Sequence, residues 1–516
     1  MTSVAAPVGS LATRREWIGL AVLALPCILY SMDLTVLNLA LPHLTADLKP
    51  SSAQLLWIVD IYGFMIAGTL ITMGTLGDRI GRRRLLMIGA AAFGIASVLA
   101  AFSTSAAMLI ATRALLGIAG ATLAPSTLSL IRNMFLDPAQ RTFAIGVWIT
   151  SYSAGGAIGP LLGGMMLEYF WWGSVFLIGV PVMVLLLVLG PVLLPEFRDR
   201  NARRLDLLSA ALSLAAVLAT IYGLKRMAEH GIDPWSASSI AIGIAIGIVF
   251  IRRQRELADP LIDVRLFRAA AFSVPLAAYT LATFVVFGAF LFIGQYLQLV
   301  LDLSPFQAGQ WTLPSMMSFI FGSMLTPLIV RKIRPGFVMA AGLMLAALGF
   351  ALLAQIDSGA GVTLVVLASI AYSLGLAPVF TLATDLIVGT APAERAGAAS
   401  AISETSSEFG GALGIAILGS IGTAIYRGHM TDALPKGVPV MAAEAARNTL
   451  GGAVSAASQL ATPLNAALLD VAREAFTQAL HAVAVIAALV MIATAVMTAI
   501  LLRRVRERQS TSEATV

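Results

Sequence analysis

The sequence predicts an all-α integral membrane protein with fourteen transmembrane helices. Of its 516 residues, 59% are hydrophobic and only 12% are charged, and the mean hydropathy is +0.90. Soluble domains usually carry about 25% charged residues, so a soluble fold could not hide this much apolar surface. Apolar runs of about 20 residues, each long enough to cross a hydrocarbon layer of roughly 30 Å, recur along the whole chain. The excess apolar surface must therefore face lipid.

The apolar runs divide into fourteen predicted spans. The first follows Arg14 and Arg15 and is too long for the apolar region of a cleaved signal peptide, so we interpret it as an uncleaved helix. The eighth is short and rich in Ile and Gly. The predicted spans cover residues 17–41, 54–75, 84–103, 106–131, 142–167, 172–194, 205–226, 236–252, 271–300, 308–330, 336–355, 362–390, 399–426 and 477–502.

The distribution of Lys and Arg predicts the orientation. With the N-terminus inside, the inner segments hold 25 of the 33 basic residues and the outer segments hold seven, while Arg113 lies within a span. Cytoplasmic loops of membrane proteins carry such an excess. Both ends of the chain have arginine clusters, which requires an even number of spans. We therefore predict a multi-pass protein of the bacterial inner membrane with both termini in the cytoplasm.

One predicted outer loop, residues 427–476, is much longer than most of the others. It is rich in Ala with scattered charges such as Glu444, Arg447 and Asp470, which predicts two amphipathic helices folded over the outer mouth. Two interpretations remain open for this hairpin. It is either a passive surface element or a gate.

The sequence offers no site for ATP, a metal or covalent catalysis. None of the four lysines is followed by Ser or Thr, so the chain has no Gly-Lys-Ser/Thr phosphate-binding loop. The four histidines are scattered without metal-ligand spacing, and the single cysteine, Cys27, cannot form a disulfide within the chain. We therefore predict a transporter without a cofactor rather than an enzyme. The net charge of +6 arises from basic inner loops, so we predict no nucleic-acid partner.

The loop between the second and third spans has an unusual sequence. Residues 74–82 read Gly-x-x-Gly-Asp-Arg-x-Gly-Arg, in which the glycines allow a tight turn where two helices approach closely. Asp78 can cap the next helix or pair with a basic residue, and Arg79 and Arg82 anchor the loop in the cytoplasm. A basic inner loop alone would explain the arginines but not the pattern. We expect these three charged residues to act in the conformational change rather than in binding.

This loop resembles the signature motif of the major facilitator superfamily. Residues 33–42 of the first span are similar to the first-helix motif of its fourteen-span drug exporters. Residues 113–121 are similar to the buried-arginine motif, although Leu116 stands where a glutamine is common. Residues 155–164 resemble the antiporter motif of exporters. The resemblance, which extends from residue 14 to about 505, indicates the fourteen-span drug:proton antiporter family, whose members export quaternary ammonium compounds and dyes.

The resemblance implies a major facilitator fold of two six-helix bundles plus two extra central helices. The first bundle would comprise residues 1–196, and the second residues 269–505, including the hairpin. Residues 197–268 would form the extra helices, which we expect to pack at the periphery, and residues 506–516 a flexible tail. Transport would occur by alternating access, in which one bundle rocks against the other.

The antiporter-like stretch also has a physical interpretation. Gly155, Gly159 and Gly163 share one helix face, so a neighbouring helix can pack there backbone to backbone. Pro160 removes a helical hydrogen bond and permits a bend, and Gly164 completes the motif. We expect the bend to seal one end of the cavity.

Six charged residues lie within predicted spans, where charges are costly and usually functional. We expect Asp33, Asp60, Glu404 and Glu408 to bind the cation or the proton, although each also has a local structural explanation. By the helical rise of 1.5 Å per residue, Asp33 and Asp60 fall at a similar height in the outer half. Two carboxyls at i and i+4, Glu404 and Glu408, cannot both ionise cheaply in a low dielectric, so at least one should hold a proton near neutral pH.

The other two charges, and four aromatic residues, have supporting roles in this hypothesis. Arg113 would modulate the proton affinity of a nearby acid or lock the inward-facing state. Asp385, close to the inner end of its span, is expected to be exposed to water or to cap the helix. Aromatic rings attract lipophilic cations, and the possible aromatic cavity wall comprises Tyr30, Trp57, Tyr62 and Trp148.

The resemblance and the acids together predict a proton-coupled antiporter that exports lipophilic cationic drugs, dyes, quaternary ammonium biocides and antiseptics. The proton gradient would drive it, and we expect it to act as a monomer in the lipid bilayer. Two alternatives keep the same fold. One is export of an endogenous metabolite or antibiotic by the same proton antiport, and the other is a nutrient symporter, against which the apolar character of the spans argues.

Overall fold

The structure, a computed structural model, describes residues 11–50, 52–198, 206–230, 233–257, 260–356 and 361–503. All regular elements in these ranges are helical, so the predicted all-α class is confirmed. The helices are α1 (Arg14–Leu48), α2 (Ser52–Ile80), α3 (Arg82–Ala101), α4 (Ala106–Gly120), α5 (Leu123–Met134), α6 (Pro138–Tyr169), α7 (Ser174–Leu177), α8 (Gly179–Leu193), α9 (Leu207–His230), α10 (Pro234–Glu256), η1 (Val264–Arg268), α11 (Ala270–Gln295), η2 (Tyr296–Val300), α12 (Pro305–Val330), α13 (Pro335–Leu353), α14 (Val362–Thr390), η3 (Ala393–Arg395), α15 (Ala396–Ala433), α16 (Val440–Asn448), α17 (Leu450–Ala457) and α18 (Leu464–Leu501).

These helices lie at the positions of all fourteen predicted spans. Thirteen segments of the described chain are long and apolar enough to cross a membrane. The predicted fifth span corresponds to α6, a helix of 32 residues. The fourth span is divided into α4 and α5, and the sixth into α7 and α8. The chain is therefore a multi-pass membrane protein.

Several helices begin at side chains that satisfy the free backbone N–H groups of a first turn. Asp137 accepts a hydrogen bond from the backbone of Gln140 at the start of α6. Capping boxes start α10, where Asp233 pairs with Ser236, and α12, where Ser304 pairs with Gln307. Such caps stabilise a helix by about 1 kcal/mol and fix where the chain enters the membrane-spanning segment.

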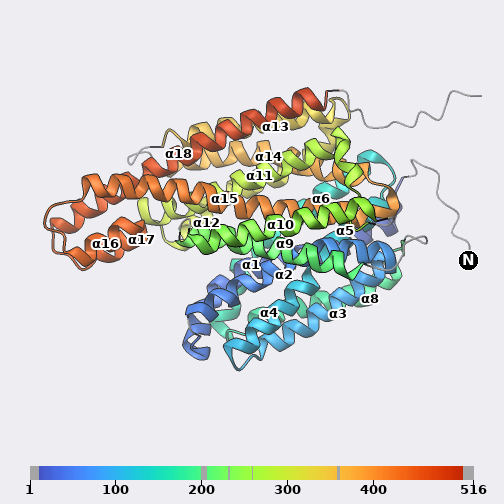
Figure 1. Ribbon diagram of the computed structural model, residues 1–516, viewed down its shortest axis with the longest axis horizontal. Helices are drawn as coiled ribbons and strands as arrows, with labels where there is room; N and C mark the ends of the chain where they lie inside the picture. Colours follow the sequence, from blue (N-terminus) through green and yellow to red (C-terminus); the bar gives the residue numbers. More distant parts are fainter. Residues whose placement is uncertain are drawn as a thin grey trace, which may run out of the picture.

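The helices gather around two hydrophobic cores, one formed mainly by α1–α8 and the other by α11–α18. In Figure 1 the first group lies below and the second above. We expected the extra helices at the periphery. In the structure α9 packs against both α2 and α15, and α10 packs mainly on α9. The extra pair therefore covers one seam between the two groups, while α6 and α12 pack against each other between the same groups.

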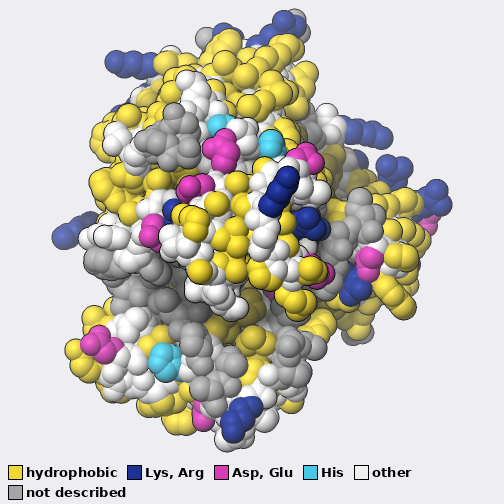
Figure 2. Space-filling view, turned by 90° about the vertical axis from the view of Figure 1, so that its left-hand side faces the viewer, with side chains coloured by type: hydrophobic (Ala, Val, Ile, Leu, Met, Phe, Trp, Pro, Cys, Tyr) yellow, Lys and Arg dark blue, Asp and Glu magenta, His cyan; other side chains and the backbone are white. Residues whose placement is uncertain are grey.

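The two ends of the molecule differ. In Figure 1, α1 begins and α18 ends at the right-hand end, which we call the terminal end. At the left lie α16 and α17, and we call this the hairpin end. The hairpin contains the two predicted short helices, but α15 continues to Ala433 and α18 begins at Leu464, so much of the predicted loop belongs to longer helices. Figure 2, seen from the hairpin end, shows a smaller lower lobe beside the larger upper body.

Candidate functional site

The signature loop holds the two helix groups together at the terminal end. The Asp78 carboxylate at the end of α2 accepts hydrogen bonds of 3.0 Å from the backbone N–H groups of Gly397 and Ala398, in the first turn of α15. A negative charge at a helix N-terminus is favourable because of the free N–H groups and the helix dipole. Arg82 also donates to Asp78 at 2.9 Å and reaches the carbonyl of Ala393 at 2.6 Å. The predicted cap thus forms, but on a helix of the other group.

The helices α2 and α15 can approach closely at this junction because glycines face each other there. Gly74 of α2 lies against the carbonyl of Gly397, and a methyl group added to Gly74 would come within 2.5 Å of that oxygen. Arg79, the third charged residue of the motif, lines a pocket beside it together with Asp263 and Arg395. Hydrogen bonds from Arg265 hold the pKa of Asp263 below its ordinary value. Asp263 therefore stays ionised and forms an ion pair of 3.6 Å with Arg395.

A second ionic junction at the same end corrects the prediction for Asp385. We expected this residue to be exposed to water or to cap a helix. Its side chain is instead 5% exposed and pairs with Arg141 of α6 at 2.6 Å, while Thr142 donates to the second carboxylate oxygen at 2.7 Å. The prediction failed because sequence spacing does not reveal that the end of α14 faces α6. We call the contacts of Asp78, Arg82 and Asp385 the latch.

The glycine face of α6 packs against α1. A methyl group added to Gly155 would meet the carbonyl of Ile28 at 2.2 Å, and one added to Gly163 would meet Val36 at 2.7 Å. Gly159 is buried on the same helix face, whereas Gly164 has open space around it. Pro160 lies within α6, but its side chain is outside the described residues. The helix partner that the glycine spacing predicted is therefore α1.

We expect Gly155→Val to abolish function by separating α6 from α1. The added atom is fixed directly to the α6 backbone and would meet a backbone carbonyl of α1, so neither can move away cheaply, and overpacking of this kind costs about 1–3 kcal/mol or more. Gly164→Val is the matched control on the same helix, because its added atoms would meet nothing. The two variants are to be compared by thermal unfolding in detergent and by transport. Equal behaviour of both variants would contradict the proposed packing role.

Glu404 and Glu408 lie on one face of α15, and neither forms an ion pair within the described residues. The Tyr30 hydroxyl of α1 donates to Glu408 at 3.2 Å. The Oε1 atom of Glu404 is buried and has no hydrogen-bond partner among the described residues. No ion pair to either carboxylate forms within the described part of the chain. A buried carboxyl without a basic partner is most stable in its neutral form, so this pair can hold a proton.

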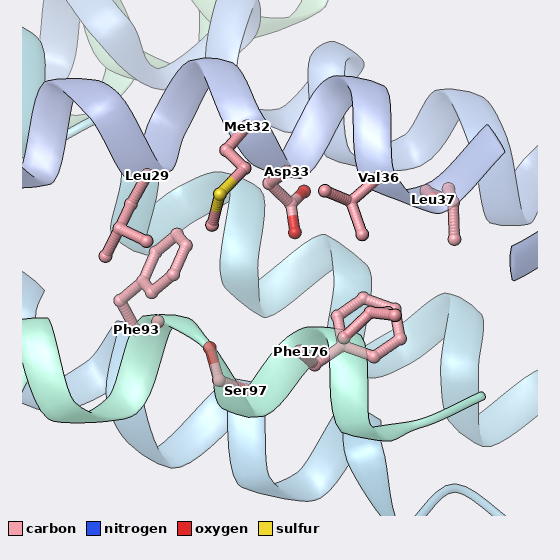
Figure 3. A pocket seen from close by; sticks show the side chains of 10 residues that line it. Leu29, Met32, Asp33, Val36, Leu37, Phe93, Ser97 and Phe176 are labelled. Atoms are coloured by element: carbon pink, nitrogen blue, oxygen red, sulfur yellow. The ribbon is translucent and has the colours of Figure 1, made fainter. Parts of the chain in front are cut away.

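Asp33 pairs with Arg113 inside the first helix group. The Arg113 guanidinium lies 3.3 Å from the Asp33 carboxylate, donates to the carbonyl of Ile58 at 2.6 Å, and is 1% exposed. Asp33 projects from α1 into a pocket lined by Phe93, Ser97 and Phe176 (Figure 3). The structure therefore supplies the acid neighbour that we expected for Arg113.

Asp60 pairs with Lys225, a residue of the extra helix α9. The Lys225 ammonium also lies 4.8 Å from the centre of the Phe64 ring. The sequence predicted that Asp33 and Asp60 lie at a similar height in the outer half. In the structure they lie in separate polar clusters, since the first faces α3 and α7 whereas the second faces α9.

Three of the four predicted aromatic residues form a connected group between the acids. Tyr30 lies 6.3 Å from Tyr62 and 5.5 Å from Tyr152, which in turn contacts Trp148 at 4.8 Å between ring centres. Trp148 is buried and donates to Thr127. Trp57 lies apart, 43% exposed, with its ring 6.0 Å from Phe64. The four residues of the predicted aromatic cavity wall therefore belong to two separate aromatic groups, one around Tyr30 and one formed by Trp57 and Phe64.

The connected group links the two helix groups chemically. Arg113 lies 5.1 Å from the centre of the Tyr62 ring, Tyr62 neighbours Tyr30, and Tyr30 donates to Glu408. These contacts form a continuous series of neighbouring groups from Glu408 to the Asp33–Arg113 pair. Sequence reasoning missed Tyr152, Phe64 and Lys225. A tyrosine three residues before the glycine motif was the available signal for Tyr152, whereas Lys225 was counted among the outer-side charges.

Comparison with known proteins gives a consistent result. The family model described as Major Facilitator Superfamily matches residues 23–415. The multidrug efflux pump LfrA of Mycolicibacterium smegmatis is 42% identical over 95% of this chain and 97% of its own length. The methyl viologen resistance protein SmvA of Salmonella typhimurium is 38% identical, over 90% of this chain and 93% of its own. The tetracenomycin C resistance and export protein of Streptomyces glaucescens is 32% identical, over 78% of this chain and 76% of its own length.

Two solved structures share the fold. The human organic anion transporter MFSD10 covers 93% of this chain and 100% of its own, with a TM-score of 0.58 and 15% identity. A bacterial homologue of the human lysosomal transporter Spinster, in an inward-facing and unoccupied conformation, covers 97% of this chain and 100% of its own. Its TM-score is 0.56 and its identity 17%. At such low identities these likenesses concern the fold alone.

Proposed function

Because this chain belongs to the major facilitator superfamily, we propose that it is a proton-coupled antiporter that exports lipophilic cations by alternating access. The chain is a membrane transporter of small molecules and not an enzyme. Its relatives include multidrug efflux pumps and antibiotic export proteins, which supports drug efflux as its activity. The proton coupling and the cationic class of substrate are our proposal.

The observation that carries the proposal is the pair of half-buried carboxyls on α15. Among the acids within the helices, Asp33, Asp78 and Asp385 have arginine partners, and Asp60 has a lysine. Within the described part of the chain, Glu404 and Glu408 have no basic partner. A proton or an organic cation can each satisfy such a site, but both together cannot. Mutual exclusion of the two ligands at one site is what an antiporter requires.

The transport cycle follows from this exclusion. Protons enter from the outside and occupy the glutamate pair, which displaces the cation outward. The protonated carrier then turns inward, releases its protons and takes up the next cation. From the positive-inside rule we expect the terminal end to lie on the cytoplasmic side of the bacterial inner membrane. In the proposed cycle, the closed latch at that end belongs to the outward-facing state.

The electrical balance limits the stoichiometry. Exchange of one proton for one monovalent cation moves no net charge and uses only the pH gradient, which is worth about 1.4 kcal/mol per pH unit. Each further proton would also use the membrane potential, at about 2.3 kcal/mol per 100 mV. Two adjacent carboxyls provide places for two protons.

A second candidate function uses the same mechanism with another cargo. Three relatives have names that refer to export of, or resistance to, an antibiotic, namely tetracenomycin C, puromycin and cephamycin. Export of an antibiotic or metabolite made in the cell would need the same coupling site but a different substrate wall. The two relatives at 42% and 38% identity, a multidrug efflux pump and a methyl viologen resistance protein, favour export of foreign compounds.

Reconstitution in proteoliposomes tests the proposal. With an imposed pH gradient and a trapped acid-sensitive dye, we expect addition of ethidium or benzalkonium to cause proton movement through the protein. Vesicles without protein, and vesicles whose gradient is collapsed with an ionophore, are the controls. If no lipophilic cation moves protons, the proposed coupling is wrong. Proton movement with sugars or amino acids would indicate the nutrient symporter instead.

A further inference from the structure

The extra helix α9 contributes a positive charge to a site that has the chemistry of a cation-binding site. Lys225 forms an ion pair with Asp60 of α2, and its ammonium lies 4.8 Å from the centre of the Phe64 ring. The Trp57 ring lies 6.0 Å from that of Phe64. A carboxylate beside aromatic rings is the arrangement that binds organic ammonium groups. Here the bound ammonium belongs to the protein itself.

We infer that Lys225 is a tethered cation that occupies a second cation subsite, formed by Asp60, Phe64 and Trp57, and that a dicationic substrate displaces it. This inference rests on the proposed function, because it concerns how lipophilic cations are selected. A monocation would use the glutamate pair and leave Lys225 in place. A dication would put one charge at the glutamate pair and the other at Asp60.

The packing around Lys225 fixes the helix but leaves its side chain accessible. Ile221 of α9 is buried against Phe64 and Ala67 of α2, and Phe409 of α15 packs on the same cluster. The side chains of Lys225 and Asp60 remain 37% and 23% exposed. The α9 backbone is thus held in the seam, whereas the flexible stem of the lysine can swing toward water. The ion pair is partly solvated, so its opening costs less than that of a buried pair.

The subsite adjoins the glutamate pair. Phe409, which follows Glu408 in α15, belongs to the same cluster as Phe64, and the field of the Lys225 ammonium reaches the Glu408 carboxylate. With Lys225 in place, Asp60 contributes no net charge for a ligand. When the lysine leaves, the seam offers two anionic positions instead of one. The lysine therefore sets the number of positive charges that the site accepts.

A purely structural role for the pair gives a different expectation. If Lys225 only holds α9 against α2, its replacement would weaken binding of every substrate, or of none, through a change in packing. A tethered cation acts selectively, because its removal frees Asp60 for dications alone. The two explanations are therefore separated by the ratio of dication to monocation affinity.

The test is equilibrium binding to the purified full-length protein in detergent, with tetraphenylphosphonium as the monocation and methyl viologen as the dication. Lys225→Met removes the ammonium but keeps the stem. We expect its affinity for methyl viologen to rise about tenfold, an amount that corresponds to about 1.4 kcal/mol. The affinity for tetraphenylphosphonium should stay within about threefold of wild type, because its site is the glutamate pair and Lys225 acts there only at longer range.

Three further variants serve as controls. Lys225→Arg keeps the charge and should keep the wild-type ratio. Arg226→Gln removes a charge from the neighbouring position of α9, where the partner is Asp233 rather than Asp60, and should leave the ratio unchanged. Asp60→Asn combined with Lys225→Met removes both partners and should lose the gain for the dication. Because this double variant has no unpaired charge, it also remains informative if Lys225→Met folds poorly.

The outcomes separate this inference from the proposed function. If wild type and Lys225→Met bind both cations with the same ratio, the second subsite is wrong and the antiport proposal is untouched. The same holds if both affinities rise equally, or if methyl viologen binds less tightly to Lys225→Met. If the wild-type protein binds neither cation, the proposed function is overturned and this inference with it.

Discussion

Glu408→Gln is expected to abolish proton-coupled export completely. The substitution keeps the size of the side chain and leaves an oxygen that can accept the hydrogen bond from Tyr30, which measures 3.2 Å. It removes the ionisable group, so the site can no longer exchange a proton for a cation. In proteoliposomes with an imposed pH gradient, we expect uptake of ethidium to fall to the level of vesicles without protein.

Proton release shows whether this loss comes from the coupling site itself. When tetraphenylphosphonium is added to wild-type protein in weakly buffered detergent solution, protons should leave the glutamate pair, and a pH-sensitive dye will report them. Glu408→Gln should release fewer. Tyr30→Phe is the matched control, because it removes the hydrogen bond to Glu408 and keeps the carboxyl, so it should still release protons. Normal export by Glu408→Gln would remove Glu408 from the coupling mechanism.

The second large effect is expected for Asp33→Asn, which leaves the Arg113 guanidinium without its counter-charge. Arg113 is 1% exposed and lies 3.3 Å from Asp33. Removal of one partner from a buried ion pair usually costs about 3–5 kcal/mol. We therefore expect Asp33→Asn to lower the unfolding temperature in detergent and to stop export.

A compensating variant distinguishes lost stability from lost function. Asp33→Asn combined with Arg113→Gln has no uncompensated charge, so it should recover much of the stability but not the export activity. Asp206→Asn is the control for loss of a solvent-exposed ion pair. The side chain of Asp206 is 21% exposed and that of its partner Arg253 is 35% exposed, and such pairs contribute at most about 1 kcal/mol. Wild-type export by Asp33→Asn would show that the pair is not needed.

The membrane fold could be predicted from the sequence because lipid imposes a simple rule. Each crossing needs an apolar helix of sufficient length, and all fourteen predicted spans lie on helices. The helix ends were less predictable. Hydropathy detects the part of a helix that lies in lipid, but α1 continues to Leu48 and α15 to Ala433, beyond the apolar segments.

The candidate site was predictable in part. Spacing within one helix placed Glu404 and Glu408 on a common face, and it placed Gly155 and Gly163 at one helix contact. Partners on other helices could not be inferred from spacing. The ion pairs of Asp60 with Lys225 and of Asp385 with Arg141 join residues far apart in the sequence. Their formation depends on how the helix groups face each other, which no local pattern encodes.

The position of α9 has a consequence for molecules dissolved in the lipid. On the flank where α2 meets α15, α9 covers the seam, with Leu214 and Leu218 packed into the space over Gly68. On the opposite flank, α6 and α12 touch directly, with Gly146 close to the carbonyl of Ser323. A lipophilic solute that enters laterally from the bilayer must displace α9 on the first flank. On the second flank it needs only to separate α6 from α12. Lateral entry from the bilayer is therefore easier between α6 and α12 than between α2 and α15.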